Sequence, residues 1–131
     1  MSAFLKIKKR KDFIRAAKAG ESVATTSLVL QAARSLSEEV VPPKFGFTTT
    51  KRLGHAVVRN RARRRLRAAV RELYLTEARD NIEYVLIGRY DTADCDFEIL
   101  RRDLKYAFRK IHRLLEGKQD ENCAQPSHQT D

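Results

Sequence analysis

Residues 44–71 read KFGFTTTKRLGHAVVRNRARRRLRAAVR, and their pattern determines the expected topology of the chain. The stretch opens with the alternation typical of a strand, in which Phe45 and Phe47 share one face while Thr48 and Thr50 share the other. From about Ala56 the apolar residues recur every three or four positions, which predicts a helix. The stretch therefore predicts a strand that passes through a basic turn into a long helix.

The predicted helix spans roughly residues 56–75 and has an apolar face and two basic flanks. At about 100° per residue, the apolar face can dock on a sheet. It comprises Val58, Ala62, Leu66, Ala69, Val70 and Leu73. One basic flank comprises Asn60, Arg63, Arg64, Arg67 and Arg71, and the opposite flank comprises Arg61 and Arg65.

All the charged residues of the basic turn and of the first part of this helix are positive. Between Lys51 and Arg71 there are nine Lys or Arg residues and no Asp or Glu. Like charges four residues apart, such as Arg63 and Arg67, oppose helix formation by a few tenths of a kcal/mol per pair. Something outside the helix should therefore neutralise them, and phosphates suit the planar fork of arginine. The pattern predicts that this helix binds a polyanion.

The remaining sequence predicts a helix over residues 11–20, a strand within 23–33 and a polar turn over 35–43. A strand over residues 84–89, apolar on both faces, precedes a final amphipathic helix that begins at Asp96. We expect an α+β fold in a single domain, residues 1–116, followed by a disordered tail, residues 117–131.

The composition agrees with this organisation. The 131 residues carry a formal charge of +10, and 42% of them are hydrophobic, which is enough for one core and favours nucleic acid as the partner. No apolar run approaches the length of a membrane span, and no apolar segment follows the basic N-terminus as in a signal peptide. We expect a cytoplasmic protein that does not enter membranes. Cys95 and Cys123 lack metal-ligand spacing and are given no role.

The block from Lys44 to Arg61 resembles the signature of the protein component of bacterial ribonuclease P. The shared features are a strand containing glycine, a basic turn ending in Gly54-His55-Ala56-Val57, and Arg59-Asn60-Arg61 at the start of a helix. Asp12-Phe13 followed by Gly20 is similar to the family's first helix. The resemblance covers about residues 5–115.

The resemblance implies an αβββαβα sandwich with a left-handed βαβ crossover around the Arg-Asn-Arg helix. It also implies a subunit that assists a catalytic RNA in removing the 5′ leader of precursor tRNA. Its partners would be that RNA, with one protein expected per RNA, and precursor tRNA. Catalysis would be carried by the RNA and Mg²⁺, with no catalytic or metal-ligating residue in the protein.

The resemblance also implies site residues. Arg59, Asn60, Arg61, Arg64 and Arg67 match the family's RNA-contacting helix, and Lys51 and Arg52 match its basic turn. The periodicity adds Arg63 and Arg71 to the RNA-binding candidates, and His55 beside the turn is placed to contact phosphate. A cleft for the single-stranded leader is matched by Phe13, Val29, Thr48 and Thr50.

Two positions of this cleft depart from the family pattern. Ala17 and Gln31 stand where the family often has aromatic residues. We therefore expect a cleft that stacks less on the leader and forms more hydrogen bonds with it.

Three other functions would fit parts of the sequence. An independent nuclease would need converging carboxylates, and the only local cluster is Asp91, Asp94 and Asp96. This cluster is explained more simply as a polar loop with Asp96 capping the last helix, with a peripheral Mg²⁺ contact as the alternative. A ribosomal-type RNA-binding protein would share the charge and size but not the ordered block ending in Arg-Asn-Arg. A DNA-binding helix-turn-helix would need a helix before Leu53-Gly54-His55, where a strand is predicted instead.

Overall fold

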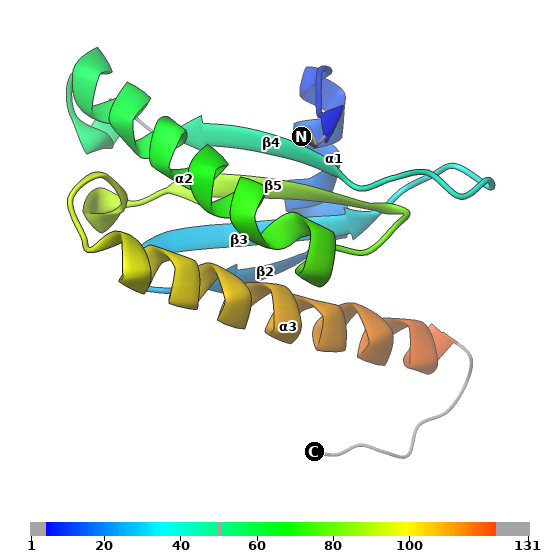
Figure 1. The fold of residues 1–131 in the computed structure, drawn as a ribbon. Helices are drawn as coiled ribbons and strands as arrows, with labels where there is room; N and C mark the ends of the chain where they lie inside the picture. Colours follow the sequence, from blue (N-terminus) through cyan, green and yellow to red (C-terminus); the bar gives the residue numbers. More distant parts are fainter. Residues whose placement is uncertain (1–4, 50, 123–131) are drawn as a thin grey trace.

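The computed structural model describes residues 5–49 and 51–122, which form one sheet covered by helices on both faces. Figure 1 shows the elements in chain order. They are β1 (Leu5–Lys6), α1 (Arg10–Ala19), β2 (Glu21–Ala24), β3 (Leu28–Arg34), β4 (Lys44–Thr49), η1 (Lys51–Leu53), α2 (Ala56–Glu77), β5 (Ile82–Gly88), η2 (Tyr90–Ala93) and α3 (Phe97–Asn122).

The five strands lie in the order β1-β4-β5-β3-β2. β4 pairs parallel with β5, and β3 pairs antiparallel with both β5 and β2. In Figure 1, β4 and β5 point the same way and α2 crosses on the near side of the sheet, so the step between them is left-handed. Parallel crossovers are almost always right-handed. The predicted αβββαβα order is confirmed from α1 onward, together with its left-handed crossover.

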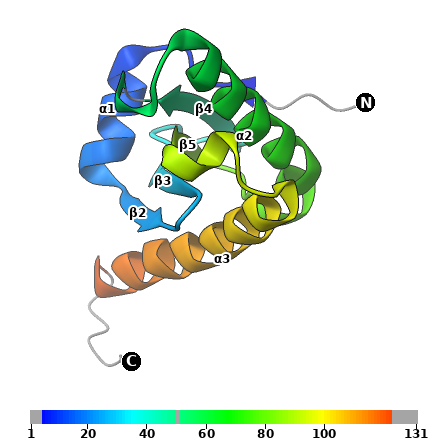
Figure 2. The same ribbon diagram turned by 90° about the vertical axis from the view of Figure 1, so that its left-hand side faces the viewer.

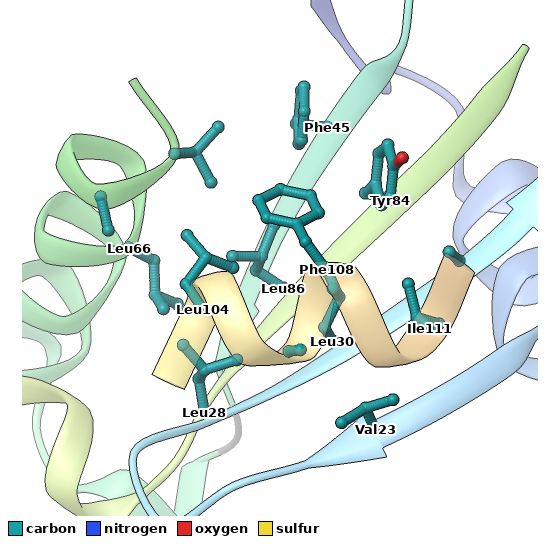
Figure 3. Packing of buried hydrophobic residues seen from close by; sticks show 14 of the residues in the cluster. Val23, Leu28, Leu30, Phe45, Leu66, Tyr84, Leu86, Leu104, Phe108 and Ile111 are labelled. Atoms are coloured by element: carbon teal, nitrogen blue, oxygen red, sulfur yellow. The ribbon is translucent and has the colours of Figure 1, made fainter. Parts of the chain in front are cut away.

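The two faces of the sheet have different covers. Figure 2 shows α1 on one side of the sheet and α2 and α3 on the other. The main core lies beneath α2 and α3, where Phe45 stacks on Tyr84 with ring centroids 5.1 Å apart and Phe108 meets Tyr84 edge-on at 5.2 Å. Figure 3 shows these rings among the aliphatic side chains of β3, β5, α2 and α3.

A smaller cluster attaches α1 to the opposite face. Ala16 of α1 packs with Ile7, Ala33 and Val85, and Phe13 packs against this cluster while remaining partly exposed. Arg15 of α1 donates to the carboxylate of Glu83 on β5, which is otherwise buried. Because only one short helix covers this face, part of the sheet beside α1 remains open.

Three element boundaries differ from those expected. Residues 23–33 form two strands, because Thr25 bonds to Leu28 through both its backbone and its hydroxyl and closes a hairpin between β2 and β3. β1 was not expected, and it pairs with β4 over two residues. α3 continues through Gly117 to Asn122, so the expected domain boundary at residue 117 lies inside a helix, while residues 123–131 lie outside the described chain.

Candidate nucleic-acid interface

The apolar face of α2 docks on the sheet as predicted. Ala62, Leu66, Ala69 and Val70 are buried, and Val58 and Leu73 at the two ends of this face are half-buried. Tyr74 was not expected on this face, yet it is buried and meets Phe45 edge-on at 6.0 Å. The docking face fixes which way the arginines point.

The flank containing Asn60, Arg63, Arg64 and Arg67 lies toward β4. Arg63 donates to the Thr49 hydroxyl at 3.0 Å and also to the side-chain oxygen of Asn60. The Arg67 guanidinium lies over the Phe47 ring, 5.4 Å from its centroid. Arg64 is exposed and has no hydrogen bond or ion pair within residues 5–49 and 51–122. Side chains of β4 therefore hold Arg63 and Arg67 in place, and Arg64 beside them extends into solvent.

The opposite flank is partly neutralised by the chain itself, contrary to the expectation that all of these charges need an external partner. Arg61 forms an exposed ion pair with Asp94 at 3.2 Å. Arg65 donates to the carbonyl oxygens of Thr92, at 2.9 Å, and Cys95. Its guanidinium also lies 5.8 Å from the centroid of the Phe97 ring. Arg65 thus joins α2 to the start of α3, a role that sequence periodicity could not distinguish from solvent exposure.

The start of α2 gathers more of the candidates. Arg52 and His55 are exposed, and His55 occupies the N-cap position without a side-chain cap. Arg59 is half-buried and its amide donates to the His55 carbonyl at 3.0 Å. Lys51 belongs to η1, and Arg71 is exposed further along, in the C-terminal half of α2. These positions and the β4-facing flank are continuous along one helix and the turn that precedes it.

A groove of about 580 Å³ lies beside α1 on the other face of the sheet. It brings together four of the six predicted cleft residues, namely Phe13, Ala17, Gln31 and Thr48. Val29 is half-buried in β3 but is not part of the groove wall, and Thr50 lies outside the described residues. The sequence did not identify the other wall residues, which are Lys8, Arg10, Ile14, Phe47, Val85 and Ile87.

Phe13 and Gly46 fit closely in this groove. A β-carbon at Gly46 would collide with the Phe13 ring, so only glycine lets the ring lie directly on β4. Phe13 thus has one side packed against the sheet and another on the groove. Phe13 is therefore both a packing residue of α1 and part of the groove wall.

The acidic and histidine residues do not converge. Within the described chain, no group of three His, Cys, Asp or Glu side chains is placed to hold a metal ion. Asp94 pairs with Arg61, and Asp96 directly precedes α3, where its carbonyl accepts from the amides of Ile99 and Leu100. His112 is buried 2.6 Å from the Tyr84 hydroxyl, and burial, followed by the charge of Arg79, lowers the pKa of His112 to about 4.

Of the helices within residues 5–49 and 51–122, not one combines the length and apolar character needed to cross a bilayer.

Known proteins share both the sequence and the fold. The model of a family described as Ribonuclease P matches residues 1–112. The ribonuclease P protein component of Gluconacetobacter diazotrophicus is 44% identical over 105 residues, which cover 80% of this chain and 89% of that protein. The corresponding protein of Ruegeria pomeroyi is 44% identical over 107 residues, covering 81% and 85%.

Solved structures agree with these matches. The Staphylococcus aureus RNase P protein superposes with a TM-score of 0.66 and 26% identity, covering 82% of this chain and 94% of that one. The RNase P protein from Thermotoga maritima gives a TM-score of 0.66 at 21% identity, covering 79% and 96%, and supports the fold alone.

Proposed function

Since the chain belongs to the ribonuclease P protein family, and is thus the protein component that works with a catalytic RNA in tRNA 5′ maturation, we propose how its two surfaces divide that work. The β4-facing flank of α2 and the basic turn before it bind the catalytic RNA. The groove beside α1 binds the single-stranded 5′ leader of precursor tRNA. Family membership also separates this chain from ribosomal-type RNA-binding proteins, which share only its charge and size.

The arrangement of α2 supports the first assignment. Phosphate contacts depend on cations whose geometry is fixed and whose charge is not already neutralised. Arg63 and Arg67 are held against β4, whereas Arg64 is exposed beside them. Arg61 contributes less to RNA binding, because Asp94 already pairs with its guanidinium in the free protein and competes with phosphate. We therefore assign the principal contacts to Arg63, Arg64 and Arg67, with Lys51, Arg52, His55, Arg59, Asn60 and Arg71 extending the surface.

The groove supports the second assignment, and this is the observation that carries the proposal. Single-stranded RNA is recognised by stacking on aromatic rings and by hydrogen bonds to exposed base edges. The groove offers Phe13 for stacking and the polar side chains of Gln31 and Thr48 for hydrogen bonds. Ala17 leaves an open, exposed position where a second ring could have stood. Base stacking in this groove therefore depends chiefly on Phe13.

The remaining parts of the proposal concern the assembly. Mg²⁺ is held mainly by the RNA, because the surfaces described above are cationic and suit phosphate rather than a second cation. One protein binds one catalytic RNA in the cytoplasm. The protein contributes substrate affinity and stabilises the active form of the RNA.

The leader groove is tested by equilibrium binding to the reconstituted holoenzyme. We expect precursor tRNA to bind more tightly than mature tRNA, and Phe13→Ala to reduce this difference by about tenfold, the effect of losing about one stacked base. Ile99→Ala, which removes another partly exposed apolar side chain on the far helix α3, is the control. Equal affinity of the wild-type holoenzyme for both tRNAs would overturn the groove assignment.

A further inference from the structure

A second concavity lies where β1 leads into α1, and lysines form most of its wall. Its cations come from both sides of this junction and from the first residue of β4, with Asp12 as the one acidic residue in the wall. They are Lys6, Lys8, Lys9, Lys11 and Lys44. We call this concavity the lysine pocket.

The charges of the lysine pocket are not neutralised inside the described part of the chain. None of its five ammonium groups forms an ion pair or a hydrogen bond with residues 5–49 or 51–122. The other cationic surface, on α3, differs in this respect. There Arg109 pairs with Glu77, and Arg101 pairs with Glu72 and Glu98. Lys105 and Arg113 on α3 also lack an ion pair in the described chain, but the lysine pocket gathers more such cations than the α3 surface does.

The start of α1 adds to this potential. Lys9 occupies the N-cap position and its side chain does not cap the helix. The first amides of a helix lack partners within the helix and carry a partial positive charge. Asp12 in the first turn offsets part of this charge. The lysine pocket thus combines five ammonium groups with a helix start that has no side-chain cap.

The lysine pocket is continuous with the groove. Lys8 belongs to the wall of both concavities. β4 connects them as well, because Lys44 at its start lies in the pocket and Thr48 lies in the groove, about 13 Å further along an extended strand. A polynucleotide that follows β4 through the groove away from α2 reaches the lysine pocket next.

We propose that the lysine pocket binds the phosphates of the leader that emerge from the groove at the end away from α2, the surface assigned to the catalytic RNA. This inference rests on the proposed leader groove. The groove contacts bases and depends on a single phenylalanine for stacking, whereas the lysine pocket contacts only the backbone. Its contribution is therefore independent of leader sequence and dependent on leader length.

The test compares leaders of about four and about ten nucleotides, which fall within the range of site sizes of single-strand grooves. Binding of precursor tRNA is measured with the reconstituted holoenzyme carrying Lys6→Gln, Lys9→Gln and Lys11→Gln together. Lys8 is left unchanged because it also lines the groove. The control carries Lys18→Gln, Lys105→Gln and Lys110→Gln, which remove the same charge from other parts of the surface.

We expect the pocket variant to bind the long leader about five- to tenfold more weakly and to keep its affinity for the short one. The slope of log affinity against log salt for the long leader should fall by about 0.7 for each phosphate that the protein no longer neutralises. Replacing the same three lysines with arginine should preserve both the affinity and the slope, and the control variant should behave as wild type.

Two outcomes would overturn the inference. If the variant loses affinity equally for both leaders and for mature tRNA, these lysines bind elsewhere on the RNA. If wild-type holoenzyme prefers precursor to mature tRNA but does not distinguish the two leader lengths, the proposal for the lysine pocket is wrong and the assignment of the groove is unaffected. Failure of the groove itself would appear separately, as equal affinity for precursor and mature tRNA.

Discussion

The guanidinium of Arg67 lies over the ring of Phe47, 5.4 Å from its centroid, and Phe47 also forms part of the groove wall. One residue of β4 therefore borders both candidate surfaces, with its ring on the side of α2. Such an interaction holds a guanidinium in place without consuming its hydrogen-bond donors. The buried Nε of Arg67 has no hydrogen-bond partner in the described chain. The ring orders the cation, and the Nη groups, which form no hydrogen bond within the described chain, keep their donors for an external ligand.

The β4-facing flank of α2 is tested by Arg64→Ala combined with Arg67→Ala. We expect weaker binding to the catalytic RNA and a salt slope lower by about 0.7 to 0.9 for each phosphate that the variant fails to neutralise. Arg102→Ala with Arg113→Ala, which removes two exposed arginines from α3, is the matched control. An unchanged slope for the α2 variant would mean that these arginines are only solvated.

Arg65 gives the opposite expectation, although it lies in the same run of arginines. Arg65→Ala removes the hydrogen bonds to the Thr92 and Cys95 carbonyls that attach α2 to the start of α3. The free energy of unfolding should fall by about 1 to 3 kcal/mol, whereas Arg64→Ala should leave it nearly unchanged. Urea denaturation of the two variants checks this, and equal stability of both would contradict the structural role of Arg65.

The fit between Phe13 and the sheet is tested by adding one methyl group. Gly46→Ala places a carbon in the space occupied by the Phe13 ring, so the ring must move and the groove must change shape. We expect a loss of about 1 to 3 kcal/mol in stability together with weaker binding of precursor tRNA. Gly117→Ala, where the added carbon meets nothing within 4 Å, should instead stabilise α3 slightly. A neutral Gly46→Ala would contradict the close packing of the ring on β4.

His112 predicts how stability depends on pH. Its pKa is about 4 in the folded protein, mainly because of burial, against the ordinary value of 6.5. Between about pH 6.5 and about pH 4, the unfolded chain therefore binds a proton at His112 whereas the folded protein does not. Stability should fall as pH decreases from about 6.5 to about 4, by up to about 3 kcal/mol, and be fully retained above this range.

Urea denaturation between about pH 4 and about pH 8, a range that spans the window set by the two pKa values, measures this dependence. His112→Gln should flatten the curve, whereas replacing the exposed His55 with glutamine should leave it unchanged. The same loss of stability in wild type and His112→Gln would show that another group is responsible.

The sequence predicted the fold well where periodicity is strong. The apolar face of α2 from Ala62 to Val70 and the alternation in β4 both match the structure, because each pattern extends over several turns or residue pairs. The split between β2 and β3 was missed, since Thr25 and Thr26 favour strands as much as turns and the hairpin depends on a hydrogen bond between Thr25 and Leu28. Two residues of β1 are too few to give any period.

The candidate sites were harder to predict, for a physical reason. The position of η2 and the residues after it decides which arginines form hydrogen bonds within the chain. Arg65 reaches the carbonyls of Thr92 and Cys95, whereas Arg64 does not. The predicted groove residues came from α1, β3 and β4, while Val85 and Ile87 of β5 belong to a stretch that was expected only to form a strand apolar on both faces. Val85 and Ile87 lie two residues apart in the strand and so share a face, and this spacing could have identified them as groove residues. Lys8 was interpreted only as part of a basic N-terminus, because nothing local indicates that it borders the groove.

The whole proposal requires that this chain act as the protein partner of a catalytic RNA. The most direct measurement is cleavage of precursor tRNA by the isolated catalytic RNA at low Mg²⁺, with and without the purified protein. We expect the protein to restore cleavage at the mature 5′ end and to have no nuclease activity alone. Cleavage by the protein without RNA, or failure to restore cleavage by the RNA, would show that the proposed partnership is wrong.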